Sequence, residues 1–311
     1  MGFKELFLKK RTLYCDGSTI RFDEPMKAHT SLAVGGPAAV FANPENTSQL
    51  REILLFANTE GMQVIYLGGG TNLLVTDEPL EAVVISTGHF RGIELLRKES
   101  GESILKVDSG EALKGFLSYC RKAGLAGLEG LSGIPGSVGG AIKGNSGSYG
   151  TEIKDLLLRV EILSADGMLR SLKNEELGMK YRGTGLKESD LILAGEFLLK
   201  EDDPERVRFK MNEYFALKRK TQPIEARSAG CVFKNPPGEF AGKLIEEAGL
   251  KGTRVGDIEV SPVHANFFVN RGKGTARDFM DLMEKVSEKI FARAGITLEP
   301  EIRVIRNAVN K

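Results

Sequence analysis

The chain has 311 residues, 41% of them hydrophobic and 27% charged, an ordinary globular composition with enough length for two or three domains. Its formal net charge of +1, from 43 basic and 42 acidic side chains, argues against a nucleic-acid-binding protein. No secretory signal is recognisable, and no apolar run reaches the ~18 residues that a membrane helix needs. We therefore expect a cytoplasmic protein without a membrane or nucleic-acid partner. The sequence does not give the oligomeric state; a monomer without an obligate protein partner is the form we favour.

Cysteine and histidine are scarce and scattered: Cys15, Cys120, Cys231, His29, His89 and His264. They form neither a C-x-x-C pair nor an H-E-x-x-H motif, so we expect no metal site. An odd number of cysteines in a reducing compartment favours free thiols. For each cysteine, the simplest role is that of a small buried hydrophobic residue.

The first part of the chain alternates between strands and helices. We expect a helix after Asn46 or Ser48, either of which is a suitable N-cap, because apolar side chains recur at helical spacing until Gly61. Short apolar runs predict strands at Ala38–Ala42, Val64–Leu67 and Val83–Ser86. This order predicts a small α/β unit.

The second part begins near Ile93 and contains Ala165-Asp166-Gly167, which is typical of a hairpin turn. The elements expected in chain order are a strand at Ile104–Asp108, a helix at 111–123, a glycine-dense segment at 124–150, hairpin strands at Arg159–Leu163 and Met168–Leu172, and a strand at Leu191–Leu199.

A helix that begins at Pro204 and ends near Lys220 leads into the third part. A second long helix, at 275–294, is predicted by an apolar face and ended by Gly295. The remaining expected elements are a helix at 240–248 and strands at Phe267–Asn270 and Ile302–Ile305. We therefore expect three domains: 1–88, 89–202 and 203–311.

Two glycine-rich segments are candidate ligand-binding loops: Gly68-Gly69-Gly70-Thr71-Asn72 and Gly133-Ile134-Pro135-Gly136-Ser137-Val138-Gly139-Gly140. Glycine lets the main chain approach a ligand and present N–H groups to an anion. Two tight turns explain either segment alone equally well, but two such segments in adjoining units favour one shared diphosphate site. No G-x-G-x-x-G and no G-x-x-x-x-G-K-[ST] motif occurs, so neither a Rossmann nor a P-loop nucleotide site is expected.

Three further segments carry groups suited to chemistry. Cys231 lies in Ser228–Pro236, where we expect a turn or the start of a strand, and Glu299 and Glu301 flank Pro300 at a strand entry. The third segment is the pair Tyr181-Arg182. Taken singly, a core thiol, a solvated strand end and a surface pair explain these segments as well.

Taken together, these motifs resemble those of the UDP-N-acetylenolpyruvoylglucosamine reductase family. The motifs follow one another in the family's order along nearly the whole chain: YLGGGTNLLV, GLSGIPGSVGGAI, YR, SAGCVFKNP, AGKLIEEAGLKG and LEPEIR. At 311 residues without an obvious insertion, the chain resembles the shorter form of the family, which lacks the substrate-covering tyrosine loop.

The resemblance implies a mixed α/β and α+β fold. Two subdomains would form an FAD-binding fold of the vanillyl-alcohol-oxidase type, and a C-terminal α+β domain would bind substrate. It also implies an NADPH-dependent FAD enzyme that reduces UDP-N-acetylglucosamine enolpyruvate to UDP-N-acetylmuramate in peptidoglycan precursor synthesis. NADPH is expected as co-substrate, with hydride passing from flavin N5 to C3 of the enolpyruvyl group and a proton reaching C2.

Residue roles follow from the matching motifs. The catalytic residues implied are Cys231, Glu301 and Arg182. The cofactor-binding residues implied are Gly68, Gly69, Gly70, Thr71, Asn72, Leu73, Ile134, Pro135, Gly136, Ser137, Gly139, Gly140, Asn145, Gly147, Tyr149 and Arg303. The substrate-binding residues implied are Tyr181, Arg182, Asn235 and His264. Arg219, in the basic run Lys218–Lys220, is a further substrate-binding candidate that could supply charge for the diphosphate, although a solvated helix end explains this run as well.

The chemistry needs a cation for the substrate carboxylate and an acid for C2. The Arg182 guanidinium matches a carboxylate bidentately. Cys231 stands where the family often has serine, and a thiol near its ordinary pKa of ~8.5 is protonated at neutral pH and more acidic than an alcohol. Glu301 is expected as a protonated acid, or as a partner that orients another donor, because a bare carboxylate would repel the enolate.

A second departure from the family pattern is GGAIKGNSGSYG, which leaves the roles of Lys143 and Gly144 open. Two other functions remain alternatives. One is another FAD-dependent oxidoreductase of the same fold, and the other is a non-catalytic flavin-binding relative.

Overall fold

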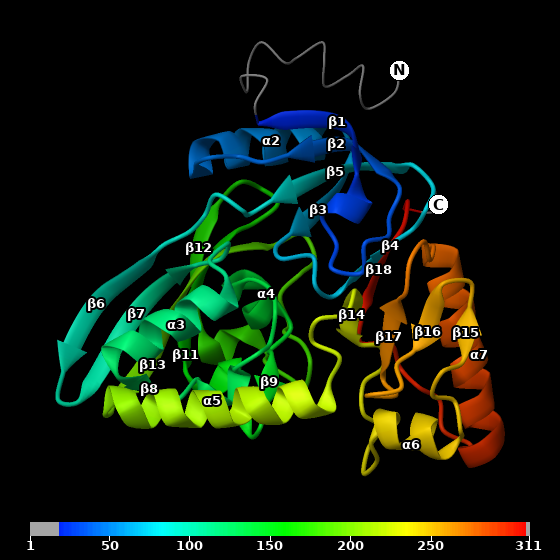
Figure 1. Ribbon diagram of the computed structural model, residues 1–311. Helices are drawn as coiled ribbons and strands as arrows, with labels where there is room; N and C mark the ends of the chain where they lie inside the picture. Colours follow the sequence, from blue (N-terminus) through cyan, green and yellow to red (C-terminus); the bar gives the residue numbers. More distant parts are fainter. Residues whose placement is uncertain (1–18, 309–311) are drawn as a thin grey trace. The chain divides into compact units, whose positions relative to one another are not determined.

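The computed structural model describes residues 19–308, which divide into two compact units (Figure 1). Unit 1 comprises the described residues up to Phe22 together with Val40–Gly69 and Glu81–Leu217. Unit 2 comprises Asp23–Ala39, Gly70–Leu80 and the described residues from Lys218 onward. Both units are discontinuous in sequence, and one division between them falls inside the first glycine-rich loop. The domain limits 1–88, 89–202 and 203–311 stay a prediction.

The first sheet of unit 1 has the strand order β1-β2-β5-β3: β1 (Ile20–Pro25), β2 (Pro37–Ala42), β5 (Leu80–Ser86) and β3 (Gln63–Leu67). Helix α2 (Thr47–Thr59) packs its apolar face against the core of this sheet. Asn46 is its N-cap, and its side chain accepts a hydrogen bond from Gln49 N at 3.0 Å. The expected β-α-β order is therefore confirmed, and Asn46 rather than Ser48 is the cap.

A larger antiparallel sheet follows, with strand order β12-β11-β13-β7-β6 and β8 beside β13. The strands are β12 (Leu169–Lys173), β11 (Leu157–Leu163), β13 (Leu191–Glu201), β7 (Glu102–Asp108), β6 (Ile93–Glu99) and β8 (Leu125–Ala126). The predicted hairpin is present as β11 and β12, and Asp166 Oδ1 accepts from Met168 N at 2.9 Å within its turn.

The helices associated with this sheet are α3 (Leu113–Ala123), α4 (Val138–Lys143) and α5 (Pro204–Thr221), and a short ribbon is made by β9 (Gly147–Ser148) and β10 (Thr151–Glu152). Phe116 of α3 lies 5.0 Å from Phe197 of β13, ring centre to ring centre, inside the shared core. Helices α3, α4 and α5 are drawn beside this sheet in Figure 1.

Unit 2 contains a sheet with strand order β14-β17-β16-β15 and a parallel pair, β4 with β18. The elements are β14 (Ser228–Cys231), β17 (Phe267–Asn270), β16 (Ile258–Val260), β15 (Arg254–Val255), β4 (Leu73–Val75), β18 (Arg303–Ile305), α6 (Ala241–Glu247) and α7 (Ala276–Ala294).

Helix α7 begins with a capping box in which the side chains of Thr275 and Asp278 each accept from the other's main-chain N–H. Its predicted apolar face is buried, and Phe279 lies 5.3 Å from Phe268 of β17 between ring centres. Each such buried side chain contributes about 1.5–3 kcal/mol of burial free energy, which holds the helix on this sheet. Within residues 19–308, no helix is both long and apolar enough to cross a membrane.

Candidate active site

The two glycine-rich segments meet inside unit 1. A Cβ atom placed on Gly69 would lie 2.7 Å from Cα of Gly136, and one placed on Gly68 would collide with Ser137 Oγ. No side chain fits there, because the obstacle to Gly69 is main chain that cannot rotate away. The structure thus brings Gly68 and Gly69 against Gly136 and Ser137, as expected for two loops serving one site. Their binding of a cofactor stays a prediction.

The second glycine-rich segment is held by hydrogen bonds and by packing against the core of unit 1. Ile134 N donates to Leu131 O at 3.0 Å and its side chain packs against the core, which anchors the exposed Pro135 next to it. Ser137 is the N-cap of α4, with its Oγ accepting from Gly140 N at 3.3 Å. Gly139 N donates to Ser109 O at 2.8 Å. The segment is therefore a rigid surface rather than a loose turn.

The continuation of the first loop lies in unit 2. Gly70 has φ +63°, and a Cβ there would collide with the carbonyl oxygen of His29, so only glycine fits. Thr71 is half-buried and Asn72 exposed, whereas Leu73 is buried at the start of β4. Arg303 pairs with Leu73 in the parallel β4–β18 ladder and donates its N–H to Asn72 O at 3.0 Å. Gly70, Asn72, Leu73 and Arg303 are thus on one continuous loop and its neighbouring strand.

Cys231 and Glu301 also lie on neighbouring segments of unit 2. Glu301 N donates to Val232 O at 2.8 Å. Next to this bond, Phe233, which follows Val232, forms an antiparallel β-bridge with Pro300, which precedes Glu301. Both Cys231 and Glu301 are half-buried. We expected Cys231 in a turn or at the start of a strand, whereas it is the last residue of β14. The Asn72 side chain completes this arrangement by donating to Glu301 O at 3.3 Å.

Asn266 is a residue of this region that sequence reasoning missed. Its buried side chain donates through Nδ2 to Phe233 O at 2.7 Å and accepts through Oδ1 from Phe233 N at 3.0 Å. It therefore pins the segment that follows Cys231. Nothing in its local sequence, HANFFVN, distinguishes it from an ordinary strand entry.

The predicted sugar-nucleotide contacts are more dispersed. Asn235 is exposed, and its Oδ1 accepts from Ala241 N at 3.1 Å at the start of α6. His264 Nδ1 accepts from Asn266 N at 3.2 Å. Burial, and then the positive charge of Lys251, lower the pKa of His264 and favour its neutral form. Arg219 is exposed at the end of α5 and pairs with Glu225 at 3.5 Å.

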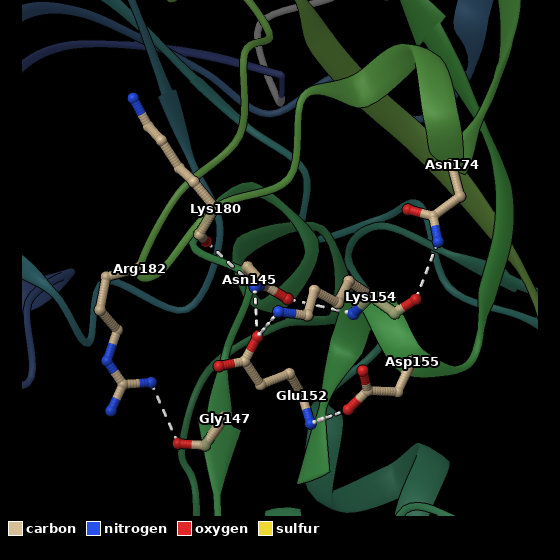
Figure 2. A network of polar contacts seen from close by, with 8 residues as sticks. All are labelled: Asn145, Gly147, Glu152, Lys154, Asp155, Asn174, Lys180 and Arg182. Atoms are coloured by element: carbon tan, nitrogen blue, oxygen red, sulfur yellow. Dashed lines mark hydrogen bonds and ion pairs between the residues drawn. The ribbon is translucent and has the colours of Figure 1, made fainter.

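Tyr181 and Arg182 form the tip of a tight turn in unit 1, where Lys180 and Gly183 pair as an isolated bridge. Figure 2 shows the Arg182 side chain reaching Gly147, to whose carbonyl oxygen Nη1 donates at 3.0 Å. The structure therefore brings Arg182 together with Gly147 and its neighbour Asn145. Tyr149, from the same loop, stacks on Tyr214 of α5 at 4.9 Å between ring centres.

Three of the six non-glycine residues with positive φ in the described part of the chain belong to this group. Asn145, Tyr149 and Arg182 have φ values of +41°, +50° and +56°, the left-handed region that non-glycine residues rarely adopt. Asparagine tolerates this conformation better than the other two. Strain of this kind persists where the surroundings dictate the backbone, and it is common at functional sites.

Arg182 borders a pocket of about 370 Å³ in unit 1. The pocket is lined by Gly147, Ser148, Gly150, Thr151, Glu152, Lys154, Asp155, Tyr181 and Arg182. The hydrogen bond from Lys154 is the main cause that lowers the pKa of Glu152; burial opposes it, and a hydrogen bond from Asn145 adds to it. Glu152 and Lys154 were missed because charges just after a glycine loop resemble any exposed turn. In the part of the chain that the structure describes, no cluster of His, Cys, Asp and Glu is arranged to hold a metal ion.

Comparisons with known proteins agree with the family resemblance of the sequence motifs. The model of the UDP-N-acetylenolpyruvoylglucosamine reductase C-terminal domain matches residues 222–305, and that of an FAD binding domain matches residues 37–173. The UDP-N-acetylenolpyruvoylglucosamine reductase of Streptococcus thermophilus is 40% identical, covering 94% of this chain and 95% of the relative. The same-named protein of Rubrobacter xylanophilus is 42% identical over 92% and 95% of the two chains.

Solved structures support the same relationship. The crystal structure of UDP-N-acetylenolpyruvylglucosamine reductase from Thermus caldophilus has a TM-score of 0.78 and 37% identity, covering 92% of this chain and 97% of that one. Bermuda grass isoallergen BG60, at 17% identity and a TM-score of 0.50, shares the fold. The expected mixed fold with an FAD-binding region is confirmed. At this level of identity and coverage, the chain belongs to the UDP-N-acetylenolpyruvoylglucosamine reductase family.

Proposed function

We propose that this protein is an NADPH-dependent FAD enzyme that reduces UDP-N-acetylglucosamine enolpyruvate to UDP-N-acetylmuramate. The observation that carries the proposal is the main-chain hydrogen bond between Glu301 and Val232, because it holds the family's carboxylate beside the segment that presents the Cys231 thiol. Family membership supports the reaction class. The arrangement of Cys231 and Glu301 supports an acid for the second step, the protonation of C2.

The residues of unit 1 fit FAD. Gly68 and Gly69 lie against Gly136 and Ser137, and glycine at three of these four positions suits the close approach of a pyrophosphate to the main chain. Beside Gly139, Ser109 Oγ is buried and has no hydrogen-bond partner among the described residues, as a group awaiting a ligand atom would be. Bound FAD supplies the hydride that the reduction consumes.

The residues that would hold FAD are those of the two glycine-rich loops and the segments next to them. Those that belong to unit 1 are Gly68, Gly69, Ile134, Pro135, Gly136, Ser137, Gly139, Gly140, Asn145, Gly147 and Tyr149. Those that belong to unit 2 are Gly70, Thr71, Asn72, Leu73 and Arg303.

Cys231 is the proposed proton donor. Saturation of the enolpyruvyl double bond needs a hydride at C3 and a proton at C2, and the neutral thiol releases its proton from Sγ to C2. The thiolate left behind regains a proton from solvent, which the half-buried position of Cys231 allows. Glu301 is proposed as the protonated group that stabilises the developing enolate or orients a donor to it.

Arg182 is the proposed partner of the substrate carboxylate. Its guanidinium presents a planar fork of donors at the edge of the pocket, where charge that develops on the carboxylate strengthens the interaction. Tyr181 lies beside it. Asn235, His264 and Arg219 are proposed to contact the sugar nucleotide, and the substrate site is proposed to receive NADPH in alternation. Action in the cytoplasm and as a monomer is part of the proposal.

An absorbance scan of the purified protein tests this function. We expect a flavin spectrum that bleaches when NADPH is added and recovers when UDP-N-acetylglucosamine enolpyruvate follows. Rapid recovery with oxygen and none with the enolpyruvyl substrate would instead indicate another FAD-dependent oxidoreductase. A flavin that NADPH does not bleach would indicate a non-catalytic relative.

A further inference from the structure

The turn that carries Arg182 needs outside support, because its own geometry is unfavourable. Arg182 sits at φ +56°, and the turn is closed by Lys180 N donating to Gly183 O at 2.9 Å and Gly183 N donating to Lys180 O at 3.2 Å. A long side chain in the left-handed region persists only where neighbouring groups dictate the backbone.

Asn145 supplies that support from the neighbouring loop. Its Nδ2 donates to Lys180 O at 3.0 Å and to Glu152 Oε2 at 2.9 Å, and its Oδ1 accepts from Lys154 N at 3.0 Å (Figure 2). The amide orientation is unambiguous, because two acceptors face one end and an N–H donor faces the other. Asn145 is only 1% exposed, so these bonds are shielded from water.

The loop of Asn145, which contacts the turn at Lys180, also contacts Arg182. Gly147, two residues after Asn145, accepts the hydrogen bond from Arg182 Nη1. Glu152 is joined to Asn145 and to Lys154 Nζ, the latter at 2.7 Å, which fixes the carboxylate beside the amide nitrogen of Asn145. Asn145 therefore stands between an anchored carboxylate and the main chain of the Arg182 turn.

We propose that Asn145 is a positioning residue that sets the orientation of Arg182 toward the substrate carboxylate, by holding Lys180 O on one side and Glu152 on the other. The inference rests on the proposed function and adds to it a role for the asparagine side chain that is separate from cofactor binding. Its physical basis is that a guanidinium displaced by about 1 Å loses bidentate geometry and on the order of 100-fold in rate.

Two substitutions of Asn145 distinguish the effect of its side-chain hydrogen bonds from the effect of its backbone conformation. Asn145→Asp keeps the shape but replaces both Nδ2 donors with an oxygen that faces Lys180 O and Glu152. Asn145→Gly accepts φ +41° without strain and removes all three side-chain bonds. Asn174→Asp is the matched control, because Asn174 Nδ2 donates only to Lys154 O, at 2.8 Å, on the outer edge of the network (Figure 2).

The first measurement needs no turnover. Hydrogen exchange at the Lys180 and Gly183 amides reports whether the turn stays closed, and we expect exchange to rise about 10-fold or more in both Asn145 variants and to stay unchanged in Asn174→Asp. Unchanged exchange in the Asn145 variants overturns the proposal, whatever the enzyme activity.

The second measurement follows the two half-reactions. Because Asn145 is itself among the residues proposed to hold FAD, both half-reactions are measured per bound flavin. Flavin recovery with the enolpyruvyl substrate should slow by about 10- to 100-fold more in the Asn145 variants than reduction by NADPH does. In an Arg182→Lys background, Asn145→Asp should add less than about 3-fold, because the two residues act as a unit. Full additivity, or a slower flavin recovery that is fully explained by lost FAD, overturns the proposal.

The wild-type protein distinguishes a failure of the proposed function from a failure of the positioning role. Wild-type protein that never recovers its flavin with the enolpyruvyl substrate contradicts the function itself, whereas normal wild-type recovery with indifferent Asn145 variants contradicts only the positioning role. If neither Asn145 variant folds, Glu152→Gln replaces them. It should raise exchange at Lys180 and Gly183 and slow the same half-reaction by about 3- to 10-fold, and no effect on either overturns the proposal.

Discussion

The main-chain N–H of Glu301 donates to the carbonyl oxygen of Val232 over 2.8 Å. Cys231 directly precedes Val232, so the main chain alone fixes the thiol and the carboxylate on neighbouring segments. Substitution of either side chain leaves this hydrogen bond in place. Variants at Cys231 and Glu301 therefore test chemistry more than folding.

We expect Cys231→Ser to retain activity within about 10-fold of wild type, whereas Cys231→Ala loses about 100- to 10,000-fold, because only the alanine variant lacks a proton at this position. The measurement is flavin recovery on adding the enolpyruvyl substrate to NADPH-reduced protein. NADPH should bleach the flavin in both variants, since that step needs no proton at C2. Normal turnover by Cys231→Ala would disprove the proton-donor role.

Glu301→Gln should be at least about 10-fold more active than Glu301→Ala, because an amide retains an N–H donor in place of the proposed carboxylic acid. Glu301→Gln should also lack any decline of turnover caused by deprotonation of this group as the pH rises. The check is a pH profile of substrate reduction for the three proteins. Equal activity of the two variants would argue that Glu301 donates no hydrogen bond.

Alkylation should separate the cysteines. Burial, and then the negative charge of Glu129, raise the pKa of Cys120, so its reactive thiolate is scarce, while Cys231 is half-buried. Cys15 lies outside the described residues, so the experiment uses a Cys15→Ser background. Mass spectrometry after iodoacetamide should find Cys231 modified and Cys120 unmodified until denaturant is added. Modification of folded Cys120 first would contradict this order.

Gly69→Ala should abolish FAD retention, because its Cβ would lie 2.7 Å from Cα of Gly136 and force the two loops apart. Gly144→Ala is the control: its Cβ would meet Gly140 O at 3.4 Å, an ordinary contact, at the end of α4. The flavin absorbance per protein after gel filtration measures the outcome. Full FAD content in Gly69→Ala would mean that the contact between the loops is unrelated to the cofactor.

Glu259→Gln should lower the free energy of unfolding by about 1–2 kcal/mol at pH 7. Burial favours the neutral acid, but the hydrogen bond and charge of Arg271 and the charge of Arg254 outweigh it and lower the pKa of Glu259 below its ordinary value of 4.5. A lowered pKa stabilises the fold above pH 4.5, and this stabilisation is lost as the pH falls through the native-state value.

The difference in unfolding free energy between wild type and Glu259→Gln should therefore narrow below pH 4.5, as measured by urea denaturation at pH 7 and pH 4. Glu247→Gln, which alters an exposed pair with Lys243 at 3.8 Å, should change the free energy by less than about 0.5 kcal/mol at either pH. A difference for Glu259→Gln that does not change with pH would contradict the ion-pair explanation.

Local signals in the sequence predicted most of the regular elements. The apolar face of α7 and its end at Gly295, the cap at Asn46 and the hairpin at Asp166 each depend on a few adjacent residues, and all are present. β6 is a different case, because its residues are mostly exposed and show no alternation of apolar and polar side chains. Its pairing with β7, rather than any local pattern, makes it a strand.

In the candidate site, too, adjacent residues predict some features and distant contacts decide the others. Motifs identified Arg182, Cys231 and Glu301 as residue types, but the adjacency of Glu301 and Val232 depends on segments about 70 residues apart, which no local pattern encodes. Asn266 and Glu152 were missed for the same reason: each acts through contacts with distant main chain or with an unmarked turn.

The pairing of β4 with β18 has a consequence for protein synthesis. Residues 73–75 are synthesised about 230 residues before their partner strand, residues 303–305. Until that strand has been made, the loop that begins at Gly70 lacks its neighbour, and Asn72 cannot receive the N–H of Arg303. A nascent chain that stops short of residue 303 should therefore leave this loop without its native support.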